Sequence, residues 1–235
     1  MKRYFQETRE LRYNFLMALP LLIVYEYEAF HLNHSDVAGI RNNADICVKN
    51  CMAYFHIEGH LAVAFLLCLT ALLIYRRERD RQVNLIYFFF MLAESLVYAV
   101  SLQPAVEKLR VLLSVSRRVQ FVSCLGAGIY EEFLFRVLFF SGCFRLLIKV
   151  LPIRWFVFWL SAVVSSAAFS YFHYMGDLAE KFNPDIFFYR FLAGMILCLL
   201  YYCRGFGIAC YTHVIYNLMV FYQLYVWKWW QWTGV

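Results

Sequence analysis

Two adjacent carboxylates and an arginine lie inside one apolar stretch of the sequence. They are Glu131, Glu132 and Arg136, and Phe, Leu and Val make up the other residues between positions 133 and 140. On insertion scales a charged side chain at the centre of a membrane helix costs roughly 2.5–3.5 kcal/mol. Charged groups this close together are therefore expected to pair with one another, to have a function, or both.

Further polar groups occur in two later apolar stretches. Phe169 and His173 are four residues apart, and so are His213 and Asn217. Residues with this spacing lie on one face of an α-helix, so each stretch presents its pair in one direction. We expect the three helical faces to meet at one shared active site.

A carboxylate, two imidazoles and a carboxamide are suited to the hydrolysis of a carbonyl compound. Glu131 and His173 can polarise a water molecule for attack on the carbonyl carbon. His213 and Asn217 can donate hydrogen bonds to the oxyanion that forms. These four residues are the predicted catalytic group.

Glu132 and Arg136 are expected to form a salt bridge that fixes their helix. Consecutive residues of an α-helix point about 100° apart, so Glu131 cannot share that arginine equally. Glu131 therefore remains available as the general base. A separate acid, Glu94, lies in another apolar stretch and is expected to be a hydrogen-bonded partner inside the helix bundle.

The composition indicates a membrane protein. Apolar residues make up 63% of the 235 residues and charged residues 16%, whereas soluble domains average about 45–50% and about 25%. We predict an all-α, polytopic transmembrane helix bundle of about seven to eight spans, too short to carry a separate soluble domain. The net charge of +6 lies in short clusters beside apolar runs, which is typical of membrane topology and does not indicate nucleic-acid binding.

Seven spans are predicted, with loops between them, over residues 13–30, 54–75, 85–102, 121–147, 155–174, 186–203 and 206–225. An amphipathic interfacial helix is expected before the fourth span, at residues 104–120. One structural domain is predicted, in three parts: N-terminal helices with the interfacial helix (1–119), a catalytic core (120–225) and an aromatic interfacial tail (226–235). Basic loops predict a cytoplasmic N-terminus, in the bacterial inner (plasma) membrane.

The three motifs together resemble those of the CPBP (CAAX protease and bacteriocin-processing) family, also called the ABI family. The matching motifs are Glu131-Glu132-x-x-x-Arg136, Phe169-x-x-x-His173 and His213-x-x-x-Asn217. Their order and their placement in apolar helices match the family over residues 120–220. The run from Arg190 to Gly194 resembles the segment that precedes the last motif.

The resemblance implies an intramembrane endopeptidase whose substrate is a membrane-anchored or lipid-bearing protein. It also implies that Glu131 and His173 activate the hydrolytic water, while His213 and Asn217 stabilise the oxyanion. The remaining motif residues are expected to support this site: Glu132, Arg136 and Phe169. The resemblance favours a glutamate-type mechanism that requires no cofactor.

Two alternatives concern the details of this site. Glu131, His173 and His213 could form a zinc site with an open fourth position. Arg190 could hold a substrate carboxylate, or it could extend its charge to the membrane interface.

A different class of function is a non-catalytic membrane protein, either a transporter or an immunity-type binding partner with a degenerate site. Ionisable groups within membrane helices also mark ion pathways. Transporters often contain repeated halves, and the sequence shows no such repeat.

Overall fold

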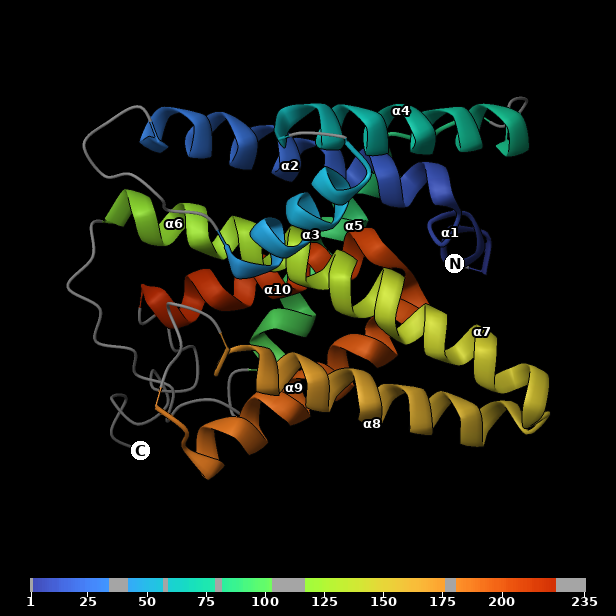
Figure 1. The fold of residues 1–235 in the computed structure, drawn as a ribbon. Coiled ribbons are helices and arrows are strands. Elements are labelled where there is room, and N and C mark those ends of the chain that lie inside the picture. The colour runs from blue at the N-terminus through green and yellow to red at the C-terminus, as the bar shows by residue number, and fades with distance from the viewer. Residues whose placement is uncertain are drawn as a thin grey trace, which may run out of the picture.

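The computed structural model describes residues 2–33, 42–56, 59–78, 82–102, 117–175 and 181–222. These residues form helices and no strand, which confirms the all-α class (Figure 1). The helices are α1 (Lys2–Glu7), α2 (Leu11–Asn33), α3 (Asn43–Tyr54), α4 (Gly59–Glu78), α5 (Ile86–Leu102), α6 (Arg117–Gly126), η2 (Ala127–Glu131), η3 (Phe133–Phe140), α7 (Ser141–Val150), α8 (Arg154–Phe172), α9 (Pro184–Arg204) and α10 (Phe206–Phe221).

Three of the described helices are long and apolar enough to cross a membrane. They are α2, α8 and α9, and each corresponds to a predicted span, although α8 ends two residues before the predicted end at residue 174. The apolar helices α5 and α10 are shorter than these three. The predicted aromatic tail at 226–235 lies outside the described residues.

The connection between the first two predicted spans contains a helix where a loop was expected. This helix, α3, ends at Tyr54, and the next helix, α4, begins at Gly59 rather than at residue 54, the predicted start of the second span. Asn42 caps the start of α3 by accepting a hydrogen bond from the Ala44 N–H, and Asp45 lies in its first turn. Both features favour a helix N-terminus.

One long helical segment carries the first motif. Residues 117–150 are helical without a break through α6, η2, η3 and α7, and cross the bundle diagonally in Figure 1. The predicted interfacial helix at 104–120 lies mostly outside the described residues, but its last four residues belong to α6. Arg118, in this first turn, forms an ion pair of 2.7 Å with Glu28 of α2.

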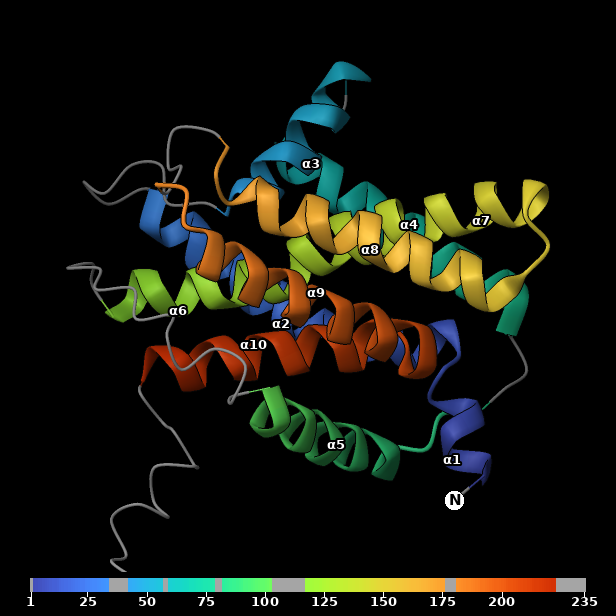
Figure 2. The same ribbon diagram turned by 90° about the horizontal axis from the view of Figure 1, so that it is seen from below.

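The last helix, α10, lies inside the bundle, where it packs against α5, α2, α9 and η2 (Figure 2). The contact with η2 is close because residue 128 is glycine. A Cβ atom on Gly128 would lie 2.2 Å from Val214 Cγ2 and 2.9 Å from the Cys210 carbonyl oxygen. Real Cβ atoms do not approach other atoms this closely, so Gly128 allows α10 to lie directly against the helix of the first motif.

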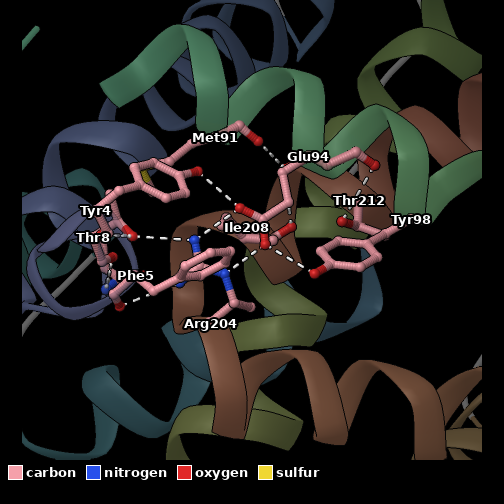
Figure 3. A network of polar contacts seen from close by, with 11 residues as sticks. Tyr4, Phe5, Thr8, Met91, Glu94, Tyr98, Arg204, Ile208 and Thr212 are labelled. Carbon is pink, nitrogen blue, oxygen red and sulfur yellow. Dashed lines mark hydrogen bonds and ion pairs between the residues drawn. The ribbon is translucent and has the colours of Figure 1, made fainter. Parts of the chain in front are cut away.

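Glu94 is a structural partner inside the bundle, as predicted (Figure 3). Its carboxylate accepts hydrogen bonds from Arg204 Nη2 at 2.7 Å, Tyr4 Oη at 2.8 Å and Tyr98 Oη at 2.9 Å. Arg204 also donates to Thr8 Oγ1 at 3.1 Å. The network joins α1, α5 and α9. Its polar groups bond to one another, which indicates a structural role.

Candidate functional site

The first motif lies on π-helical turns, which are frequent at functional sites. The turns of η2 and η3 flank Glu132 on both sides. Glu131 is 6% exposed, while Glu132 and Arg136 are fully buried. Charged groups buried in this way must be paired, since an unpaired buried charge is costly.

Glu132 joins the first motif to the third. Its Oε2 lies 3.1 Å from Arg136 Nε, which is the predicted salt bridge. Its Oε1 lies 2.7 Å from His213 Nδ1 on α10. A carboxylate accepts hydrogen bonds and does not donate them, so His213 Nδ1 carries a proton here. This bond leaves Nε2 as the imidazole nitrogen that can act on a substrate.

Phe169 brings side chains of all three motifs into contact. Its ring centroid lies 4.5 Å from the guanidinium carbon of Arg136, a cation–π contact. The same ring packs edge-on against His173 and His213, with centroids 5.2 and 6.0 Å away. Phe169 is itself 4% exposed. It is therefore the packing centre of the site, a larger role than its place in the motif indicated.

His173 follows the last residue of α8 and caps that helix. Its Nδ1 lies 3.0 Å from the carbonyl oxygen of Phe169. Because a carbonyl oxygen can only accept, Nδ1 carries the hydrogen, and in the neutral ring the lone pair lies on Nε2. The backbone thus fixes the tautomer that can accept a proton or a hydrogen bond through Nε2.

The Glu131 carboxylate interacts electrostatically with both His173 and His213. Its Oε1 also accepts a hydrogen bond of 2.9 Å from Asn42 Nδ2. Asn217 lies one turn beyond His213 on α10, is half-buried, and forms no hydrogen bond to another described residue. The structure therefore places the acid and both imidazoles together, with Asn217 next along α10.

Arg190 is a buried cation near the end of α8. It is 8% exposed on α9, and its guanidinium carbon lies 5.9 Å from the ring centroid of Tyr174. Tyr174 directly follows His173, so Arg190 lies beside the end of α8.

Asn42 is a site residue that the sequence does not predict. An Asn placed before Ala44 and Asp45 is a helix-start signal, but that signal predicts a cap and not a partner. Its contact with Glu131 joins residues 89 positions apart in the chain. Only the packing of α3 against η2 brings the two together.

The residues considered for a zinc site are Glu131, His173 and His213. Among the described residues, no group of three His, Cys, Asp or Glu side chains is placed to hold a metal ion. His213 Nδ1 is directed to Glu132 and His173 Nδ1 to a backbone carbonyl.

A cavity of about 870 Å³ lies on the other side of the motif helix, and it contains none of the predicted catalytic side chains. Leu19, Phe133 and Phe140 contribute apolar walls, while Arg9 and Arg145 contribute charge. This cavity is distinct from the group around Phe169.

Residues 113–219 match the family described as type II CAAX prenyl endopeptidase Rce1-like. The matched segment contains all three motifs and Arg190, whereas Asn42 lies outside it. Nothing matches the chain among curated proteins or solved structures. The match confirms the resemblance drawn from the motifs and, with the spanning helices, supports an integral membrane protein. Residues 113–219 are therefore similar to the CAAX-type intramembrane proteases, which supports the CPBP family resemblance.

Proposed function

We propose that the protein is an intramembrane endopeptidase that hydrolyses a peptide bond in a membrane-anchored or lipid-bearing protein. The main support is the contact of Phe169 with Arg136, His173 and His213, one or more residues from each motif. The electrostatic interaction of Glu131 with both imidazoles adds the acid to the same group. All of these residues lie in the segment that matches the family.

In the proposed reaction Glu131 is the general base. A water held between Glu131 and His173 Nε2 attacks the carbonyl carbon of the scissile bond, and its proton passes to the Glu131 carboxylate. General acid–base catalysis of this kind typically contributes about 10²–10⁴-fold to a rate. Burial of the site excludes competing bulk water and strengthens these interactions.

The oxyanion of the tetrahedral intermediate is stabilised from α10. Asn217 donates through its side-chain amide, and His213 donates through Nε2 when its ring is protonated. Glu132 orients the His213 ring, because it accepts from His213 Nδ1 and lies buried beside it. Removing one oxyanion donor typically costs about 10²–10³-fold in kcat. Arg136 holds the second oxygen of Glu132 and so keeps its orientation.

Collapse of the intermediate completes the reaction. The carbon–nitrogen bond breaks, and Glu131 returns its proton to the leaving nitrogen. The products are a carboxylate and an amine, and the enzyme regains an ionised Glu131. We assign no metal to this cycle, because Glu131, His173 and His213 act here through proton transfer and hydrogen bonding.

The activity is tested with two fluorescence-quenched peptides, one ending in a farnesylated CAAX sequence and the other lacking the lipid. The family description names a prenyl endopeptidase, so the first peptide follows that substrate class. We expect the purified protein in detergent to cut at least one peptide, with activity retained in EDTA and 1,10-phenanthroline. Loss in chelator with recovery on adding zinc would contradict the metal-free mechanism. Binding or transport of both peptides intact would instead support the non-catalytic alternative.

Arg190 is proposed to bind a carboxylate of the substrate. It is placed beside the end of α8, next to the residue that follows His173. A cation in this position could hold the chain terminus of a substrate whose scissile bond lies at His173.

We also propose a cytoplasmic N-terminus in the bacterial plasma membrane. Arg12, at the start of α2, lies 3.9 Å from Glu78 at the end of α4, so these two charged ends share one side of the bundle. Positive charge next to spans favours the cytoplasmic side. A reporter enzyme fused after residue 180 should then be exported. Activity of that fusion in the cytoplasm would overturn this orientation.

A further inference from the structure

We propose that Asn42 is a positioning residue for the Glu131 carboxylate, supplied by the N-terminal region outside the family-matched segment. This inference rests on the proposed function, in which Glu131 is the general base. The contact is the 2.9 Å hydrogen bond from Asn42 Nδ2 to Glu131 Oε1.

The orientation of the Asn42 amide is set by the helix that it caps. Asn42 Oδ1 accepts from the Ala44 N–H at 2.8 Å. An amide whose oxygen faces the cap must present its NH₂ group on the opposite side, where Glu131 lies. The backbone N–H of Asn42 donates to Tyr25 Oη at 3.4 Å, which holds the residue from a second direction.

A buried polar cluster holds α3, and therefore Asn42, against the motif helix. Asp45 accepts from Tyr25 Oη at 2.8 Å and pairs with Lys49 Nζ at 2.8 Å. Lys49 also pairs with Glu26 at 3.0 Å, and the Tyr130 hydroxyl donates to Glu26. Tyr130 directly precedes Glu131, so the cluster joins α2, α3 and the turn that carries the base.

The close approach of Asn42 requires the glycine at position 126. A Cβ atom there would lie 2.9 Å from Asn42 Cβ and 2.6 Å from Tyr25 Cε2. Gly126 thus leaves room for both side chains on the helix segment that leads to Glu131. The glycine at position 126 is therefore consistent with a site in which α3 packs against this helix.

The bond from Asn42 gives the two oxygens of Glu131 different roles. Oε1 accepts from the amide, which leaves Oε2 to take the proton of the water. The other titratable or charged groups acting on Glu131 are His173 from α8, His213 from α10, Arg136 from η3 and Cys124 from α6.

Substitutions of Asn42 separate capping from positioning. Asp is about as good an N-cap as Asn, whereas Ala is a poor one. Asn42→Asp therefore keeps the cap but replaces the donor to Glu131 with an acceptor that also carries negative charge. Asn42→Ala loses both the cap and the donor. Asn42→Ser retains a capping oxygen without the amide donor.

We expect activity and stability to rank the variants in opposite orders. Because the hydrogen bond to the charged Glu131 carboxylate is lost, Asn42→Ala should lower kcat about 10- to 100-fold with little change in KM. Asn42→Asp should lower kcat further, while its thermal stability stays nearer to wild type. If Asn42 served only as a cap, Asn42→Asp would be the more active of the two.

A second readout needs no substrate. N,N′-Dicyclohexylcarbodiimide is an apolar reagent that modifies protonated carboxyl groups, and peptide mass spectrometry can locate the adduct at Glu131. Without the amide donor, Glu131 Oε1 is no longer held in this hydrogen bond and is open to the reagent, so we expect faster labelling of Glu131 at neutral pH in Asn42→Asp and Asn42→Ser.

The outcomes distinguish this inference from the proposed function. Labelling at the wild-type rate, or full activity in Asn42→Asp, would overturn the role of Asn42 even if Glu131→Gln is inactive. Full activity of Glu131→Gln would overturn the proposed function itself. Within an inactive Glu131→Gln background, the Asn42 substitutions should cause no further loss of rate.

Discussion

Glu131→Gln is expected to lower kcat/KM for the cleaved probe peptide by about 10²–10⁴-fold, the usual contribution of a general base. Gln has nearly the same shape as Glu and can still accept the hydrogen bond from Asn42, but it cannot take a proton from water. The variant should therefore keep its fold. The measurement is the initial rate of peptide cleavage, with thermal unfolding in detergent recorded in parallel.

Glu28→Gln provides the matched control for this substitution. Glu28 is an acid of α2 paired with Arg118 at 2.7 Å, away from the imidazoles. Its replacement should leave the rate unchanged. If Glu131→Gln and Glu28→Gln both cleave the peptide at the wild-type rate, Glu131 is not the base.

Glu132→Ala is expected to destabilise the protein by about 3–5 kcal/mol, the usual cost of removing one partner from a buried ion pair. Arg136 is fully buried and would keep its charge without its carboxylate partner. His213 would also lose its bond to Glu132. Stability can be measured as the free energy of unfolding in an SDS titration.

The paired substitution Glu132→Met with Arg136→Met separates the structural part of this effect from the catalytic part. Replacing both ions with apolar groups of similar volume is often neutral or stabilising. Stability should therefore recover, while cleavage stays low because His213 has no carboxylate on Nδ1. Recovery of both stability and activity would show that Glu132 has no role in catalysis.

The contacts within each motif were predictable because they are local. A spacing of four residues joins Glu132 to Arg136 and Phe169 to His173, and both pairs are in contact. The bond from Glu132 to His213 spans 81 positions and was not predicted. It depends on the approach of α10 at Gly128, which helical spacing cannot show.

The N-terminal part of the site was not predicted because its charged residues resembled those of a loop. Asp45 and Lys49 lie in a segment of mixed polarity, which suggested exposure to water. In the structure they neutralise each other, and Asp45 is fully buried. The partners of these two residues also come from α2 and η2. Their pairing therefore cannot be predicted from residue spacing within one segment.

The position of one water molecule tests the central claim most directly. In a high-resolution experimental map of the protein in lipid nanodiscs, we expect one water within about 2.6–3.2 Å of both a Glu131 oxygen and His173 Nε2. Glu131 facing lipid, or the two groups bound to waters in separate cavities, would contradict a shared hydrolytic site.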